Sequence, residues 1–208
     1  MSIAALPATP AALPMDEIPE LPIWRLSVEQ YHAMIQAGIV TTDDRIELLD
    51  GWLLPKVPKN PSQELCLGLL TDWLNSILPK GWHLRSQGPI TMAPRSEPEP
   101  DLAVVRGSRR DFGDRHPAPD DVALVIEVAD SSLDRDRGRK LRSYAASGIP
   151  EYWIVDLTAG AIVVCRSPNR SRTRATYEDQ QALTRGQMLE APKLLNIEAA
   201  IAVSDVLP

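Results

Sequence analysis

The sequence predicts an α/β protein of the mixed (α+β) type, in which helices flank a central mixed sheet. Three observations favour this class. Residues 122–128 form a near-continuous apolar run of strand-forming type, which is typical of a central strand covered on both faces. Residues 63–77 carry apolar side chains at helical spacing. Further short apolar runs follow a second helical segment, so helices and strands alternate along the chain.

The N-terminal part adds a helix and a hairpin to this sheet. Ser27 has the character of an N-cap, apolar residues follow it at helical spacing, and Gly38 marks the end of that helix. The Asp50-Gly51 pair lies between two apolar runs and indicates a tight hairpin turn. The amphipathic helix over 63–77 comes next and ends before Pro79.

The strands of the sheet are expected in the rest of the chain. Residues 82–92 and 101–105 are predicted strands, and a polar loop with Gly and Pro precedes the central strand at 122–128. A helix is predicted over 134–147, closed by Gly148 and Pro150. Two more strands are predicted at 151–156 and 161–166.

The chain of 208 residues is long enough for one domain with its own core. Residues 1–22 are rich in Ala and Pro without a periodic pattern, so we expect a flexible N-terminal tail followed by a single domain over 23–208. Apolar runs of the roughly 18 residues that span a bilayer are missing from the sequence. The start lacks a basic segment and contains several prolines, unlike a signal peptide, so we expect a cytoplasmic protein with no membrane partner.

Charge and cysteine content narrow the classes of function. The net charge of −6 argues against a large, permanently basic surface for nucleic acid, but it does not exclude an enzyme whose basic residues are local. The arginines cluster at 106–115, 135–142 and 166–174, as solvated faces often do. Cys66 and Cys165 cannot supply a four-cysteine zinc site, so we expect two buried thiols.

Glu127 is the most informative residue. A carboxylate within an apolar strand is costly to bury unless it is neutral, paired or bound to a metal ion. Strand alternation places Glu127 on the same face as Val125 and Ala123, near the end of the strand. The simpler interpretation is a glutamate at a strand end that reaches water or pairs with an arginine.

Asp101 offers a second carboxylate at the start of a second short strand. If the two strands are neighbours, Asp101 and Glu127 would together bind one hard cation. Mg²⁺ is the natural candidate because it takes oxygen ligands and keeps several waters. The simpler interpretation is that Asp101, which follows a proline, is a turn or cap residue.

Lys140 lies on the helix that follows the Glu127 strand, so the chain can bring it back to the same place. A lysine there would position an attacking water or stabilise the charge that develops on a phosphate. A solvated lysine among arginines is the simpler interpretation. Asp130 and Asp136 are candidate partners of such a site, and Tyr144 is expected mainly to pack.

Four segments carry a resemblance to a known family. They are ELLDG (47–51), SEPEPDLAVVRG (96–107), LVIEVADSSLDRDRGRK (124–140) and YAASGIPEYWIVD (144–156). Together they resemble the bacterial Uma-type family of restriction-endonuclease-like proteins, within the PD-(D/E)XK nuclease superfamily. The resemblance covers about residues 24–190, and the joint order of the segments, rather than any one of them, makes it specific.

The resemblance implies a restriction-endonuclease-like core and assigns roles by position. Asp101 matches the acid of the Pro-Asp element, Glu127 the second acid, and Glu47 a further acid of the family. The superfamily pattern places a lysine two residues after the second acid, where this chain has Ala129, but in the resembling family the following helix supplies it, where Lys140 stands. Gln63 is a second departure, since relatives often carry a histidine there.

The function that follows is a hydrolase, a divalent-metal-dependent endonuclease that cleaves phosphodiester bonds of DNA. In this interpretation Asp101, Glu127 and Glu47 bind Mg²⁺ or Mn²⁺, and Lys140 joins them as a catalytic residue. DNA is the expected substrate, and a homodimer is expected because cleavage of two strands needs two sites. The alternative is a catalytically silent nuclease-fold module for nucleic-acid binding or protein assembly, which the acidic net charge and Gln63 favour.

Overall fold

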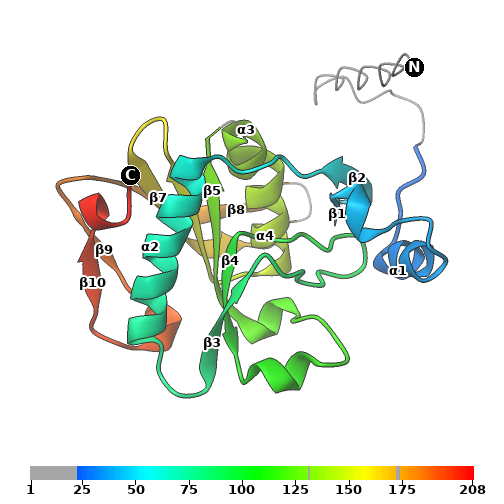
Figure 1. Cartoon of the computed structure of the whole chain (residues 1–208), viewed down its shortest axis with the longest axis horizontal. Helices are drawn as coiled ribbons and strands as arrows, with labels where there is room; N and C mark the ends of the chain where they lie inside the picture. The colour runs from blue at the N-terminus through cyan, green and yellow to red at the C-terminus, as the bar shows by residue number, and fades with distance from the viewer. Residues whose placement is uncertain (1–22, 131, 172–173) are drawn as a thin grey trace, which may run out of the picture.

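The structure is a computed structural model that describes residues 23–130, 132–171 and 174–208. These residues form a central six-stranded sheet in the order β3-β4-β5-β6-β7-β8 (Figure 1). Strands β5 and β6 pair in parallel and the other neighbours are antiparallel, so the sheet is mixed, as predicted. Its strands are β3 (Trp82–Ser86), β4 (Leu102–Arg106), β5 (Val122–Ala129), β6 (Glu151–Asp156), β7 (Ala161–Asn169) and β8 (Thr176–Thr184).

Helices cover both faces of this sheet. Helix α2 (Pro61–Ile77) packs in one apolar cluster with Leu124 and Ile126 of β5. The parallel pair β5 and β6 needs a crossover connection, which a continuous helical segment supplies on the opposite face. That segment consists of α3 (Leu133–Arg135), a π-helical turn η4 (Asp136–Lys140) and α4 (Leu141–Ser147). The predicted helix over 134–147 is therefore present, with a wider turn at its centre.

Glu127 faces the α4 side of the sheet together with Val125 and Ala129. The prediction that Ala123 shares this face is wrong, because Ala123 packs in the cluster on the α2 side. The cause is a shift in the β4–β5 register between Val104 and Val105, where an extra residue interrupts the alternation of side chains.

The predicted N-terminal helix and hairpin are confirmed and lie at one end of the molecule (Figure 1). Helix α1 (Val28–Gln36) begins at Ser27, whose Oγ accepts a hydrogen bond from the Gln30 backbone N–H at 3.2 Å. Strands β1 (Ile46–Leu49) and β2 (Trp52–Pro55) pair through a turn in which both Asp50 and Gly51 have positive φ, at 52° and 80°. This backbone suits the Asp-Gly pair that predicted it.

The C-terminal part contains strands that the sequence pattern did not predict. They are β8, β9 (Met188–Glu190) and β10 (Ala200–Ala202), of which the last two form a small antiparallel sheet. The predicted strand over 82–92 is too long, because β3 ends at Ser86, where Gln87 adopts a φ of 50°. Short 3₁₀ helices complete the described structure: η1 (Thr42–Asp44), η2 (Arg109–Phe112), η3 (Pro119–Asp121), η5 (Lys193–Leu195) and η6 (Val203–Asp205).

The tail predicted over residues 1–22 lies outside the described residues. Within the described part of the chain, every helix is too short or too polar to cross a bilayer. The elements that matter for function are instead the ends of β4 and β5, the β1–β2 hairpin and the helical crossover. These elements meet along one charged cleft.

Candidate active site

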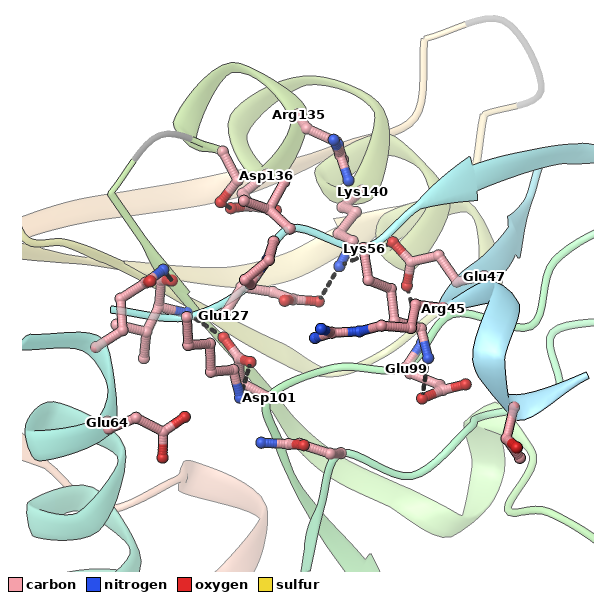
Figure 2. Close-up of a pocket in the computed structure, with 18 residues that line it drawn as sticks. Arg45, Glu47, Lys56, Glu64, Glu99, Asp101, Glu127, Arg135, Asp136 and Lys140 are labelled. Atoms are coloured by element: carbon pink, nitrogen blue, oxygen red, sulfur yellow. Dashed lines mark hydrogen bonds and ion pairs between the residues drawn. The ribbon is translucent and has the colours of Figure 1, made fainter. Parts of the chain in front are cut away.

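A cleft of about 520 Å³ lies where the hairpin, the start of β4, the end of β5 and the crossover helix approach one another (Figure 2). All four residues that the sequence singled out line this cleft: Asp101, Glu127, Lys140 and Glu47. Other charged side chains share it, namely Arg45, Lys56, Lys59, Glu64, Glu99, Arg135 and Asp136. Both signs of charge are therefore concentrated in a space large enough for a phosphate group.

Lys140 lies between two buried carboxylates. Its Nζ donates a hydrogen bond to Glu127 Oε1 at 2.8 Å and lies 3.3 Å from Glu47 Oε1. In Figure 2 its side chain reaches from the crossover helix toward both acids. Glu127 is 5% exposed and Lys140 6%, so the lysine is not the solvated residue of the simpler interpretation. Likewise, Glu127 pairs with this lysine rather than with an arginine or bulk water.

Local structure explains this convergence. Strand β5 is buried along its whole length, so its one acidic side chain needs a partner from within the protein. The crossover helix returns over the same face of the sheet and supplies Lys140 at the last position of the π-helical turn. A π-helical turn widens the helix locally, and such turns occur often at functional sites.

Tyr144 also belongs to this group, beyond the packing role expected of it. Its hydroxyl donates a hydrogen bond to Glu127 Oε1 at 2.8 Å, and its side chain is fully buried. Burial raises the pKa of Glu127 well above its ordinary value, and the Lys140 ammonium opposes this shift. Burial alone would lower the pKa of Lys140, but Glu127 and Glu47 outweigh it, so that the pKa of Lys140 is raised.

Asp101 lies immediately before β4 and beside the end of β5. In the antiparallel β4–β5 pair Leu102 is opposite Ile126, which brings Asp101 next to Glu127 along the two strands. Asp101 Oδ2 accepts a hydrogen bond from the backbone N–H of Val128 at 2.8 Å. The carboxylate is therefore bound to the neighbouring strand β5, and does not serve as the turn or cap residue of the simpler interpretation. Its other oxygen, Oδ1, lies 2.8 Å from Lys59 Nζ.

Glu47 is held from the opposite side of the cleft. Its Oε2 accepts the backbone N–H of Glu99 at 3.0 Å, while Oε1 faces Lys140. Glu99 in turn forms an ion pair with Lys56. Lys56 and Lys59 were missed by sequence analysis, because lysines between β2 and α2 carry no periodic signal and their acidic partners lie some forty residues later.

The other polar candidates support the edge of the cleft. Gln63 Nε2 donates to the carbonyl oxygen of Val128 at 3.0 Å, which ties the first turn of α2 to the end of β5. Asp136 is buried and accepts a hydrogen bond from Ser132 Oγ at 2.6 Å. Asp130 does not line this cleft: it lines a separate, smaller pocket with Asn60, whose Nδ2 donates to Asp130 Oδ2 at 2.6 Å.

The residues of the cleft fit a hard divalent cation in kind. Carboxylate oxygens of Asp101 and Glu127 come from adjacent strands, and Mg²⁺ is commonly held by one or two carboxylates together with waters and substrate phosphates. Among the described residues, however, three or more His, Cys, Asp or Glu side chains nowhere converge closely enough to hold a metal ion by themselves. Water and phosphate oxygens would therefore have to complete the coordination.

Comparison with known proteins adds to this geometry. The sequence model of the Uma2 family, described as "Putative restriction endonuclease", matches residues 28–204. The chain belongs to this family. Membership in the Uma2 family confirms the resemblance drawn from the four sequence segments, and it supports a nuclease-like function. No curated protein matches the chain.

A solved structure gives the same fold. It is the crystal structure of "a putative nuclease belonging to DUF820" from Anabaena variabilis ATCC 29413. It superposes on this chain with a TM-score of 0.64 and 12% sequence identity, covering 87% of this chain and 97% of the other. At this identity the likeness concerns the fold alone, and it confirms the predicted restriction-endonuclease-like core of a mixed sheet flanked by helices.

Proposed function

We propose that this Uma2-family protein is a divalent-metal-dependent endonuclease that hydrolyses phosphodiester bonds in DNA. The observation that carries the proposal is the Lys140 ammonium, which is buried 2.8 Å from Glu127 Oε1 beside Asp101 and Glu47. Buried ionisable groups that interact with one another in a cleft are typical of functional sites. Membership in the Uma2 family supports a nuclease-like function.

In this proposal Asp101 and Glu127 hold Mg²⁺ or Mn²⁺, and Glu47 completes the acidic cluster. A divalent ion bound there would neutralise charge on the phosphate and lower the pKa of a water molecule. The protein keeps these carboxylates in place through hydrogen bonds: Val128 N–H donates to Asp101, Glu99 N–H to Glu47, and Tyr144 O–H to Glu127.

Lys140 would act as a hydrogen-bond donor in the same site. From its place between Glu127 and Glu47, the ammonium would orient the attacking water or stabilise the charge that develops on the phosphate. Direct attack by water needs no covalent intermediate with the enzyme. Lys140, Asp101, Glu127 and Glu47 are therefore the residues on which we expect cleavage to depend.

Cleavage of plasmid and of short single-stranded DNA with Mg²⁺ or Mn²⁺ tests the proposal. We expect metal-dependent cutting that falls by about 10²-fold or more in Asp101→Asn, Glu127→Gln and Lys140→Met. Glu151→Gln is the matched control, because Glu151 is a buried glutamate on the adjacent strand β6. It pairs with Arg166 at 3.0 Å and does not line the cleft. Circular dichroism confirms that each variant is folded.

The alternative, a catalytically silent module, is favoured by one specific observation. Both proposed metal ligands already have lysine partners, Asp101 in Lys59 and Glu127 in Lys140. If folded wild-type protein cuts none of these substrates and binds Mn²⁺ no better than Asp101→Asn does, the endonuclease proposal is wrong. Retention of DNA binding under those conditions would support the silent module.

Two neighbouring active sites would allow both strands of a duplex to be cut in one binding event. We therefore propose that the chain acts as a homodimer on duplex DNA. Light scattering coupled to size-exclusion chromatography, with and without a duplex in Ca²⁺, measures the mass of the complex. A single copy on duplex DNA together with efficient cutting of both strands would contradict the dimer.

A further inference from the structure

The segment between β2 and α2 carries two lysines that face acids of the cleft. Lys59 Nζ lies 2.8 Å from Asp101 Oδ1, and the two side chains are only 18% and 14% exposed. Lys56 forms an ion pair with Glu99, two residues before Asp101. These contacts are separate from the group around Lys140, and they place one cation of the chain directly on a proposed metal ligand.

The Lys59 ammonium is held by charge rather than by hydrogen bonds. Its Nζ is shielded from solvent, and the 2.8 Å contact with Asp101 lacks the angles of a hydrogen bond. Among the described residues it has no hydrogen-bond partner. A buried ammonium normally finds acceptors for its three donors, so the ion pair with Asp101 alone offsets the burial of the Lys59 charge.

Lys59 contacts the Asp101 oxygen that accepts no backbone hydrogen bond from the described residues. The other oxygen, Oδ2, already accepts the Val128 N–H at 2.8 Å, so Oδ1, which has no backbone partner in the described part of the chain, is the oxygen more free to bind a cation. Positive charges a few ångströms apart in a partly buried cleft repel one another strongly. A divalent ion and the Lys59 ammonium therefore cannot both remain on Oδ1.

We propose that Lys59 competes with the metal ion for Asp101. It neutralises the carboxylate in the metal-free protein and leaves Oδ1 when a divalent ion binds. The inference rests on the proposed function, since it takes Asp101 as a metal ligand. Lys59 is then a positioning residue that acts through Asp101 and sets how tightly the protein binds its metal.

Titration of the full chain with Mn²⁺ in the absence of DNA tests this inference. Free Mn²⁺ is followed by electron paramagnetic resonance in wild type, Lys59→Met and Lys56→Met. Methionine keeps the length of the side chain and removes its charge. We expect Lys59→Met to bind Mn²⁺ about tenfold more tightly than wild type, because a neighbouring cation lowers the proton affinity of a carboxylate by about tenfold or more and should weaken metal binding in the same way.

Lys56→Met is the matched control, because it removes the same charge from the same segment but from a lysine that pairs with Glu99. We expect it to change Mn²⁺ affinity much less than Lys59→Met does. Asp101→Asn in the Lys59→Met background should abolish the gain. As a second readout, Mn²⁺ should raise the melting temperature of Lys59→Met more than that of wild type, since ligand binding stabilises the folded state.

Each remaining outcome is decisive. Equal affinity in wild type and Lys59→Met, with binding lost in Asp101→Asn, would overturn the competition and leave the metal site intact. Equal gains in Lys59→Met and Lys56→Met would also overturn it, because the effect would then be one of net charge alone. No Mn²⁺ binding by either wild type or Lys59→Met would overturn the proposed function together with this inference. If Lys59→Met fails to fold, Lys59→Gln takes its place.

Discussion

Lys140 Nζ lies 2.8 Å from Glu127 Oε1, and both residues are almost fully buried. Glu47, 2% exposed, lies 3.3 Å from the same nitrogen. Each charge compensates the burial of the others, so removing one of them leaves a buried charge without its partner. Variants at these positions must therefore be judged by folding as well as by cleavage.

Lys140→Met is expected to lower the free energy of unfolding by about 3–5 kcal/mol, because Glu127 and Glu47 then stay buried without a counter-charge. Glu127→Gln should cost less, because Lys140 keeps Glu47 as a partner. The double variant should be more stable than the sum of the two single effects predicts. Urea unfolding at neutral pH gives all three values, and strictly additive effects would contradict a direct interaction.

The correctly predicted parts of the fold are those with local signals. The helix over 63–77 has its apolar spacing, the hairpin has its Asp50-Gly51 turn, and β5 has a continuous apolar run. Strand β8 has no such signal, because most of its side chains are exposed and polar, and its place depends on pairing with β7. Pairing between distant segments leaves little trace in a single sequence.

The residues of the candidate site likewise divide into those with a local sequence signal and those without one. Glu127 was recognisable because a carboxylate is rare in an apolar strand, and Asp101 and Lys140 followed from their places on a second strand and on the next helix. The family resemblance added Glu47. The hydrogen bond of Tyr144 and the ion pair of Lys59 were not predicted, since what these residues touch depends on how the crossover helix and the β2–α2 segment meet the sheet. The π-helical turn that carries Lys140 likewise has no distinct sequence pattern.

Tyr144→Phe removes one hydroxyl and leaves the ring in place. Its hydrogen bond to the Glu127 carboxylate should be worth about 1.5–3 kcal/mol of unfolding free energy, as for bonds to charged groups. Tyr152→Phe is the matched control, because its ring packs 4.9 Å from that of Tyr144 and its hydroxyl donates to a neutral carbonyl, that of Asp136, at 3.2 Å. We expect cleavage to slow in Tyr144→Phe and not in Tyr152→Phe. Equal effects would mean that Tyr144 does not orient Glu127.

Alkaline pH should destabilise the protein through its buried thiols. Burial raises the pKa of Cys66 from its ordinary 9.0 to about 12. Between these values the folded protein keeps a proton that the unfolded chain has lost, so the free energy of unfolding falls as the pH rises. The full contribution is present below pH 9 and disappears by about pH 12, at up to about 1.4 kcal/mol per pH unit.

Cys66→Ala isolates this effect. Its unfolding free energy should fall less steeply than that of wild type between pH 9 and pH 10, the range below the titration of tyrosines in the unfolded chain. Cys165, whose pKa burial also raises to about 12, should behave in the same way. Identical slopes in wild type and both variants would show that neither thiol is shielded as the structure describes.

Gly51→Ala tests whether the hairpin places Glu47. Gly51 has a φ of 80°, and an added Cβ would lie 2.6 Å from the Cβ of Arg25. Gly38→Ala is the matched control, with a φ of 69° and no atom within 4 Å of its added Cβ. Backbone strain alone should cost Gly38→Ala about 1–2 kcal/mol, whereas Gly51→Ala adds overpacking worth about 1–3 kcal/mol.

Because β1 carries Glu47 toward Lys140, cleavage should fall in Gly51→Ala and persist in Gly38→Ala. Normal cleavage by a destabilised Gly51→Ala would mean that Glu47 is placed without the hairpin turn and that the acidic cluster tolerates its displacement.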